Sequence, residues 1–326
     1  MSNKLSIFAF TFQLVDYSMT VSRKLASHLV AFIIVAIWGS TFVFTKLLLN
    51  AGLSPAQIYT LRFFIAYWLL LALEIVTSRH KGTTFRLLSR SWKDEVTMAA
   101  LGLTGGTLYF LSENAAMLYT TATNTSLIVC SCPLLTMIVM AAVYHDEKLT
   151  TKRLLGSITA CLGMAIVVLN GHFVLHLSPL GDFLAFMACV SWAFYSLLIK
   201  RVTERYATMH ITRKVFFYGL VTILPYYIIF PEWPSRDTLF RFDVVANLLF
   251  LSCVASLMCF VAWNWVIRQL GPVDTTNWVY FNPITTIIFA RWILHEHITP
   301  FFLIGTVLIL TGMFLADSNT KAPTKK

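Results

Sequence analysis

The stretch from Tyr109 to Asn124 places polar and ionisable side chains between two long apolar runs. Glu113 and Asn114 stand side by side in it, and Asn124 follows a threonine-rich turn. A carboxylate at Glu113 could bind a substrate ammonium group or carry a proton, and the two amides could hydrogen-bond a substrate or a neighbouring helix. Helical spacing puts Tyr109 on the same stripe as Glu113, with Asn114 on the stripe beside it. This stretch predicts a polar lining for a substrate cavity. The alternative is a Glu113 that is solvated near the outer interface, or paired with Arg62 or Lys46.

Three further residues inside apolar runs could contact the same substrate. Arg62 lies about two helical turns into its run, where it could bind a substrate carboxylate or form a structural ion pair, with Glu113 as one partner. Trp38 and Trp192 lie near the middle of their runs, whereas membrane proteins usually place tryptophan at the headgroup level. Aromatic walls suit the apolar or cationic parts of a substrate. The second half of the chain offers five more candidate lining residues: Tyr195, Trp263, Asn264, Tyr280 and Asn282.

The composition decides which solvent surrounds these residues. Of the 326 residues, 57% are hydrophobic and 12% are charged, and the mean hydropathy is +0.72. Globular proteins carry about 25% charged residues, so this chain could not cover a water-facing surface. It is therefore expected to be an integral membrane protein. The net charge of +10 does not indicate nucleic-acid binding, because the basic residues do not form one patch and instead follow a membrane topology.

Several other chemistries are not indicated. The six cysteines all fall within apolar runs, where cysteine behaves as a small hydrophobe, so no disulfide framework, redox motif or metal site is expected. No Walker loop or dinucleotide fingerprint occurs, so neither ATP-driven transport nor a cofactor is expected. An intramembrane enzyme is also disfavoured, since no paired aspartates and no Ser/His arrangement share a common depth.

Apolar runs of about 17–25 residues, the length that crosses a bilayer, define ten candidate transmembrane helices. They cover residues 27–49, 55–77, 95–118, 121–144, 152–170, 179–200, 211–230, 244–267, 274–294 and 300–317. With the N-terminus in the cytoplasm, 20 of the 25 Lys and Arg residues fall on the cytoplasmic side, and only Arg236 and Arg241 fall on the opposite side. This asymmetry satisfies the positive-inside rule and predicts that both termini are cytoplasmic.

The ends of the chain are expected to lie outside the bilayer. Residues 1–25 form an N-terminal cytoplasmic or interfacial segment, and residues 318–326 form a cytoplasmic tail. The run from Leu5 to Val15 is too short to span a bilayer, which needs about 20 apolar residues. It is either an interfacial helix or a stretch upstream of a true start at Met19, and both alternatives stay open.

The chain also contains an internal repeat. The sequence WGSTFVFTK, which begins at Trp38, resembles WAFYSLLIK, which begins at Trp192. Asn114 and Asn264 are related by an offset of 150 residues. Each half then holds five spans, and because five is odd the two halves insert with opposite orientation. The predicted fold is an all-α integral membrane protein whose ten transmembrane helices form two inverted five-helix repeats, residues 26–170 and residues 171–317.

Glycines repeat in the last span of each half. Gly156 and Gly163 lie seven residues apart, which places both on one helix face, and Gly305 and Gly312 have the same spacing. Small residues let helix backbones approach closely in lipid. These two spans are therefore predicted to pack tightly against each other as a seam between the halves.

Together these features resemble the EamA family of the drug/metabolite transporter superfamily. The motifs that carry the resemblance are WGSTFVFTK, LRFFIAYWLL with Arg62, PLLTMIVMAAVYHDEKLT, LGDFLAFMACVSWAFYSLLIKR and NPITTIIFARWILHEHIT, and the match covers residues 26 to 317. The resemblance implies a ten-helix carrier with an inverted repeat, usually in the bacterial inner membrane. It also implies export of amino acids or related small metabolites, without fixing the substrate.

The expected function is secondary transport that exports a small metabolite by alternating access, driven by the substrate gradient or by proton exchange. The expected partners are a small-molecule substrate, protons as candidate coupling ions, and the lipid bilayer, in a monomer or a homodimer. Metabolite uptake, efflux of drugs or toxic cations, and a non-transporting membrane scaffold are the alternatives. A scaffold is disfavoured because it has no need of two oppositely oriented halves.

Overall fold

The computed structural model describes the backbone of residues 2–80, 82, 84–120, 122–144, 150–169, 178–293 and 300–316. Within these ranges, the side chains of residues 2–22, 122–124, 127, 167–169, 287, 290, 291, 293 and 302 are outside the description. Every regular element in the described part of the chain is helical, which agrees with the expected all-α class. The predicted cytoplasmic tail, residues 318–326, lies outside the described residues.

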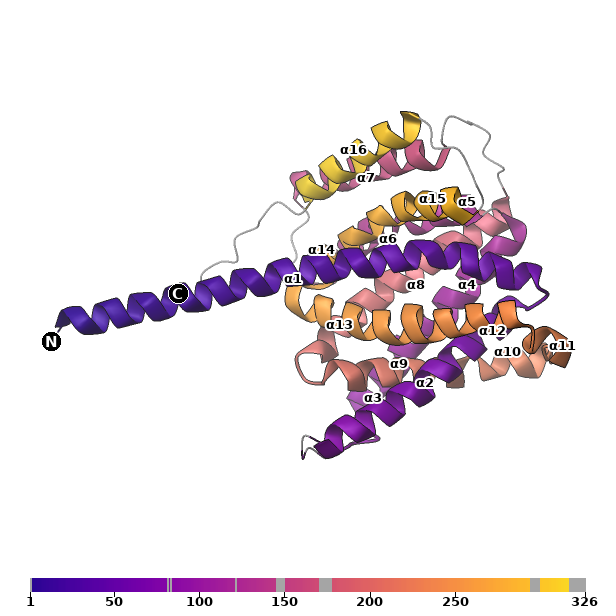
Figure 1. Cartoon of the computed structure of the whole chain (residues 1–326), viewed down its shortest axis with the longest axis horizontal. Helices are drawn as coiled ribbons and strands as arrows, with labels where there is room; N and C mark the ends of the chain where they lie inside the picture. The colour runs from indigo at the N-terminus through magenta and orange to yellow at the C-terminus, as the bar shows by residue number, and fades with distance from the viewer. Residues whose placement is uncertain are drawn as a thin grey trace.

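Helices follow one another along the whole chain (Figure 1). In the first half they are α1 (Ser2–Asn50), α2 (Pro55–His80), α3 (Trp92–Gly102), the π-helix η1 (Leu103–Leu108), α4 (Tyr109–Tyr119), α5 (Ala122–Val129), α6 (Cys132–Val143) and α7 (Thr151–Leu169). In the second half they are α8 (Pro179–Thr203), α9 (Thr208–Thr222), α10 (Leu224–Ile229), α11 (Arg236–Leu239), α12 (Phe242–Leu249), the π-helix η2 (Phe250–Met258) and α13 (Cys259–Leu270). The chain continues with α14 (Pro272–Thr276), the 3-10 helix η3 (Asn277–Phe281), α15 (Asn282–Ile293) and α16 (Pro300–Ala316).

Local sequence explains where several helices begin and end. Pro55, Pro179 and Pro300 each occupy the first position of a helix, where the missing backbone N–H has no intrahelical partner to lose. The hydroxyl of Ser178 caps α8 by accepting the N–H of Gly181 at 3.3 Å. Gly271 ends α13 with a φ of +86°, a conformation that glycine adopts without a Cβ clash.

Four helical stretches in the described part of the chain are long and apolar enough to cross a membrane. They are Arg23–Asn50, Pro55–His80, Pro179–Thr203 and Phe242–Leu270. Other predicted spans are built from shorter helices; for example, α5 and α6 are separated at Cys130 and Ser131, just before Pro133, whose ring interrupts the helical hydrogen-bond ladder. Helix length and composition therefore do not confirm the ten-span arrangement, which stays a prediction.

The largest buried cluster lies among α1, α2, α8, α9 and α13, whose side chains pack into one core. Figure 1 shows these helices as a bundle, with α7 and α16 paired along one edge of it. Each α-helix satisfies its backbone hydrogen bonds internally, as the interior of a bilayer requires. The centre of the bundle therefore holds most of the residues that the sequence singled out, and the α7–α16 pair lies beside it.

The α7–α16 pair is held together through glycines. A Cβ added at Gly156 would lie 2.7 Å from the carbonyl oxygen of Gly312, and one added at Gly163 would lie 2.7 Å from that of Gly305. Real Cβ atoms do not approach so closely, so only glycine permits this contact. The partner number falls as the α7 number rises, and the two helices therefore run antiparallel. The predicted tight packing of these spans is confirmed.

Candidate functional site

A small cavity lies at the centre of the bundle, with a volume of about 30 Å³. That space holds about two water molecules, given that one water occupies about 10–15 Å³ on this measure. The lining residues come from α1, α2, α4, α5, α6, α8, α13, η3 and α15: Trp38, Thr41, Phe42, Arg62, Tyr109, Phe110, Glu113, Val129, Cys132, Trp192, Phe260, Val279 and Asn282. Helices from both halves of the chain therefore meet at this cavity.

Two opposite charges line the cavity. The Glu113 carboxylate accepts a hydrogen bond from the Tyr109 hydroxyl at 2.9 Å. Arg62 donates from Nε to the Ser256 hydroxyl, and its guanidinium lies 4.6 Å from the centre of the Phe110 ring. Both charged residues are buried, yet no ion pair within 4.0 Å joins them in the described structure. Each keeps hydrogen-bonding capacity that a ligand between them could use.

Aromatic rings form the walls of the cavity. The rings of Trp38 and Trp192 meet edge to face with centroids 5.8 Å apart. Tyr109 contacts Trp192 at 5.0 Å, and Phe260 contacts Trp38 at 5.8 Å. The indole N–H of Trp192 and the side-chain oxygen of Asn282 are buried without a hydrogen-bond partner among the described residues. A donor and an acceptor therefore stand unused in the lining, beside rings that would enclose an apolar or cationic group.

The two π-helical segments accept hydrogen bonds from residues in or next to this aromatic lining. The Trp38 indole N–H donates to the backbone carbonyl of Ala255, in η2, at 3.0 Å. The Ser191 hydroxyl donates to the backbone carbonyl of Thr104, in η1, at 2.7 Å. A π-helical turn disturbs the regular ladder of backbone hydrogen bonds, and such turns are frequent at functional sites. Neither segment was predicted from the sequence, because no residue pattern marks a π-turn in an apolar run.

Six of the twelve predicted site residues line the cavity: Trp38, Arg62, Tyr109, Glu113, Trp192 and Asn282. Trp263 stands directly behind this lining, fully buried, with its ring centroid 4.8 Å from that of Trp38. That these residues bind a substrate remains a prediction.

Three further predicted residues, Tyr195, Asn264 and Asn114, make other contacts in the described structure. The Tyr195 hydroxyl donates to the Asn264 side-chain oxygen at 2.6 Å, and the Asn264 amide donates to Thr212 at 2.9 Å. The Asn114 amide donates to the carbonyl of Pro55 at 3.2 Å. These bonds join neighbouring helices, which was the alternative reading for Asn114, and none of these side chains lines the cavity.

Tyr280 and Asn124 complete the predicted set. Tyr280 is fully buried in a separate cluster that includes Met164 and Ile309 of the α7–α16 pair, and it does not line the cavity. Asn124 falls within α5, but its side chain lies outside the described residues. Both assignments to the substrate site stay predictions.

Some lining residues were not predicted from the sequence. Thr41 and Phe42 follow Trp38 by about one helical turn on α1, and Phe110 lies next to Tyr109 on α4. Including the residues that lie one helical turn from each predicted residue would have identified them. Val129, Cys132, Phe260 and Val279 carry no such signal, because an apolar residue in an apolar run looks the same whether it faces a cavity or a neighbouring helix.

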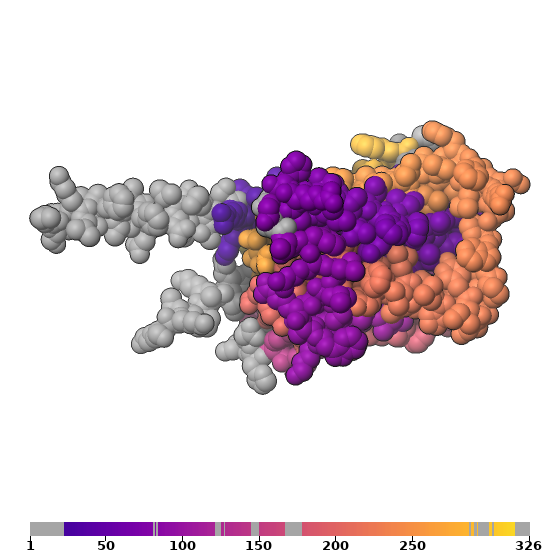
Figure 2. All heavy atoms as spheres, turned by 90° about the horizontal axis from the view of Figure 1, so that it is seen from below, coloured from indigo at the N-terminus to yellow at the C-terminus, as the bar shows by residue number. Residues whose placement is uncertain are grey.

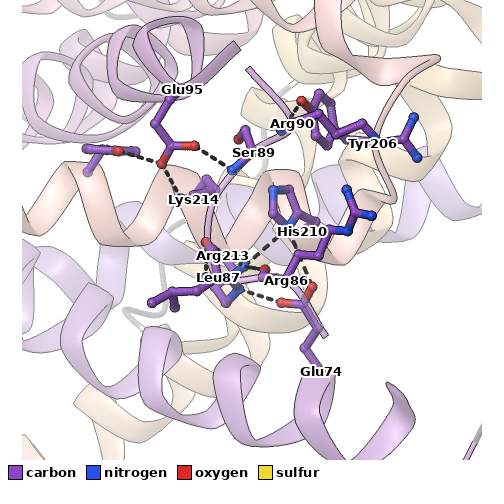
Figure 3. Close-up of polar contacts among 11 residues, drawn as sticks. Glu74, Arg86, Leu87, Ser89, Arg90, Glu95, Tyr206, His210, Arg213 and Lys214 are labelled. Atoms are coloured by element: carbon purple, nitrogen blue, oxygen red, sulfur yellow. Dashed lines mark hydrogen bonds and ion pairs between the residues drawn. The ribbon is translucent and has the colours of Figure 1, made fainter. Parts of the chain in front are cut away.

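A second polar cluster joins α2 and α3 to α9 (Figure 3). Arg213 pairs with Glu74, and Lys214 pairs with Glu95, and both cations are only 2% exposed. The sequence predicted both cations on the cytoplasmic side of the membrane, where charged residues at the ends of apolar runs are usually solvated. The structure buries them between α2, α3 and α9, so that they connect the first half of the chain to the second.

The buried ion pairs are supported by further hydrogen bonds. The Tyr218 hydroxyl donates to Glu95 Oε1 at 2.6 Å, and the Ser89 N–H donates to Glu95 Oε2 at 2.7 Å. Arg213 Nη2 donates to the carbonyl of Arg86 at 2.8 Å and lies 3.2 Å from His210 Nδ1. Such additional bonds offset the cost of removing the charges from water.

Comparison with known proteins points to membrane transport. The sequence model of the EamA-like transporter family matches residues 25–169 and 179–316. An uncharacterized transporter of Archaeoglobus fulgidus is 27% identical over 296 residues, which cover 90% of this chain and 97% of that protein. A probable amino-acid metabolite efflux pump of Escherichia coli is 22% identical over 90% of this chain and 95% of the pump. One crystal structure matches the fold with a TM-score of 0.69 at 18% identity, over 90% of this chain and 97% of that chain.

Proposed function

Because the chain belongs to the EamA-like transporter family, we propose that it is a secondary transporter that exports a small zwitterionic metabolite, such as an amino acid, by alternating access. Membership shows a multi-pass membrane transporter. The substrate class, the direction of transport and the transport mechanism go beyond family membership and form the proposal. The observation that carries it is the central cavity, whose lining includes both Glu113 and Arg62 without a direct ion pair between them.

The charges in the cavity match the two ends of an amino acid. Glu113 supplies an acceptor for an ammonium group, and Arg62 supplies a planar donor for a carboxylate. Trp38 and Trp192 would enclose the side chain between them. The relative described as an amino-acid metabolite efflux pump supports the same substrate class.

The size of the cavity favours a mechanism with moving halves. A space of about 30 Å³ is too small for an amino acid, since it holds only about two waters. Substrate binding therefore requires the surrounding helices to separate. The proposed ten helices in two inverted five-helix repeats would allow this by rocking one half against the other around a fixed site.

The buried ion pairs would keep one end of the carrier closed. Glu74 and Glu95 lie on α2 and α3, whereas Arg213 and Lys214 lie on α9. With both termini in the cytoplasm of a bacterial inner membrane, this end faces inward. Opening inward would then require α9 to part from α2 and α3, and the ion pairs to break.

Efflux of an organic cation is a second candidate. Glu113 in an aromatic cavity is a suitable receptor for a cation, but Arg62 in the same lining repels one. Purified protein in liposomes separates the two: flux of radiolabelled amino acids is expected, and flux of a quaternary ammonium dye is not. Transport of the dye alone would exclude the zwitterion proposal, and the absence of flux for both would argue against either substrate class.

A further inference from the structure

We propose that the connection between α2 and α3 binds the headgroup of an anionic phospholipid. The site is a basic patch, defined by five exposed residues of this connection and of the adjoining ends of α2 and α3: Arg79, His80, Arg86, Arg90 and Lys93. The connection lies at the end of the bundle where α2 finishes and α3 begins (Figure 1). This inference needs the chain to be a membrane protein, but it does not depend on the transported substrate.

The cations of the basic patch have no acidic partner in the described structure. None of the ion pairs among the described residues includes Arg79, Arg86 or Arg90. The guanidinium of Arg90 lies 6.0 Å from the Tyr206 ring, and its backbone N–H donates to the Tyr206 hydroxyl at 2.8 Å. These contacts position the residue without neutralising its charge.

Nearby acids are neutralised by cations from the second half of the chain. Glu74 pairs with Arg213, and Glu95 pairs with Lys214 (Figure 3). Asp94 pairs with Arg205 at 2.6 Å and also accepts the Tyr206 hydroxyl at 2.7 Å. All the carboxylates that α2 and α3 contribute to this end are thus occupied, and the positive field of the basic patch is left uncancelled.

Exposed apolar side chains alternate with these cations. Leu87 is 57% exposed, Leu88 is 64% exposed and Trp92 is 79% exposed. Leaving three large apolar side chains in water is unfavourable, whereas a tryptophan beside basic residues is typical of the bilayer interface. The segment follows directly on α2, an apolar helix long enough to span the membrane, so it lies at the level of the headgroups. A lipid is therefore the occupant that these observations favour over a soluble partner.

A hollow beside the patch has room for a headgroup. It has a volume of about 340 Å³ and is lined by Val76, Arg79 and His80. Val76 is 51% exposed on α2 and would contact the start of an acyl chain. Arg79 and His80 lie one turn further towards water, where they would donate to a phosphate. In Figure 2, the purple atoms of the segment around α2 and α3 form much of the visible face of the molecule.

The proposal is tested by measuring lipid binding to the whole purified protein. Delipidated protein in detergent is titrated with phosphatidylglycerol or with phosphatidylcholine, and bound lipid is counted by native mass spectrometry. We expect at least about a tenfold preference for phosphatidylglycerol, and its loss in the Arg79→Gln/Arg90→Gln/Lys93→Gln variant, because each cation near an anionic surface contributes measurably. The matched control is Arg236→Gln, an exposed cation on α11, which should keep the preference.

Several outcomes would overturn the proposal. Equal retention of both lipids by the wild-type protein, or an unchanged preference in the triple variant, would rule out a headgroup site in the basic patch. Displacement of the lipid by an equal concentration of inorganic phosphate would show a general anion site instead. The single Lys93→Gln variant alters only an exposed side chain, so a partial loss of preference there would separate lost binding from misfolding. Because no flux is measured, a failed transport assay would leave this result unaffected.

Discussion

Trp38 of α1 donates its indole N–H to the carbonyl of Ala255, in the π-helical segment η2, at 3.0 Å. Ser191 of α8, next to Trp192, makes a similar bond to the carbonyl of Thr104, in η1. The donors are separated by 153 residues and the acceptors by 151, close to the offset of the sequence repeat. Each bond therefore joins an irregular helical turn of one half to a helix of the other half, and the Trp38 bond fixes its ring against the cavity.

Replacing Trp38 with phenylalanine should weaken substrate binding more than stability. The change removes the hydrogen bond to Ala255, which in membrane proteins contributes about 0.6 kcal/mol on average, and lets the smaller ring shift. We expect KM for the amino acid to rise several-fold with a small decrease in Tm, measured in liposomes and by thermal unfolding. Trp68→Phe is the matched control, because Trp68 is 54% exposed on α2; a KM that rises equally there would contradict the role given to Trp38.

Replacing Glu113 with glutamine should abolish the pH dependence of transport while leaving the fold intact. Glutamine keeps an oxygen that can accept the Tyr109 hydroxyl, but it can neither carry a proton nor attract an ammonium group by charge. Initial flux is measured between about pH 5 and pH 8, the range over which a coupling carboxylate would be expected to act. If the variant retains the pH profile of the wild type, Glu113 is not the proton carrier.

Replacing Arg62 with glutamine should change the choice of substrate. Glutamine has no positive charge to bind a carboxylate, and it lifts the repulsion of a bare cation from the cavity. In competition assays between an amino acid and the amine that lacks its carboxylate, the preference for the amino acid should fall at least about tenfold. This corresponds to the loss of about 1.4 kcal/mol of binding free energy. Arg62→Lys keeps the charge and serves as the control. An unchanged preference in both variants would place Arg62 in a purely structural role.

The buried ion pair between Lys214 and Glu95 should reveal itself in a double-mutant cycle. Lys214→Met leaves the Glu95 carboxylate buried and unpaired, which typically destabilises a protein by about 3–5 kcal/mol. The double variant Lys214→Met/Glu95→Gln removes both charges and should recover much of the lost Tm. If this pair also closes the inward end, the double variant will exchange substrate faster than the wild type. Additive losses in Tm would show that the two residues do not interact.

Gly156→Val should separate α7 from α16. The added side chain would meet the Gly312 carbonyl, where a Cβ alone would lie at 2.7 Å, and such overpacking costs about 1–3 kcal/mol. Thermal unfolding should show a decreased Tm, with little effect of the control Leu155→Val, since Leu155 is 55% exposed on the next position of the same helix. Equal melting temperatures for both variants would mean that the glycine contact is dispensable.

The general features of this structure could be predicted from the sequence, because they depend on the overall composition and on the spacing of residues along the chain. Composition indicates a membrane protein, and the spacing of Gly156 and Gly163 predicts the contact between α7 and α16. Charged residues within a bilayer usually face a cavity or a partner, because burying them in lipid is costly. Arg62 and Glu113 accordingly line the cavity.

Other features depend on contacts between distant segments, which one sequence does not record. Tyr195 and Asn264 have the residue types of a binding site, but they satisfy each other across two helices. Arg213 and Lys214 look like solvated cations until the fold brings Glu74 and Glu95 to them. The ring of Pro133 interrupts the helical hydrogen-bond ladder, but how far it shortens α5 and α6 depends on packing.

The narrowness of the central cavity has a consequence for selectivity. A space for about two waters cannot admit an ion together with its hydration shell. Under the proposed substrate site, a molecule whose two charges are met at once by Glu113 and Arg62 would recover the cost of losing its hydration when the helices part to admit it. An inorganic ion, which would satisfy one of these residues and be repelled by the other, would not recover that cost. In its resting form the carrier would thus preserve the ion gradients of the membrane in which it sits.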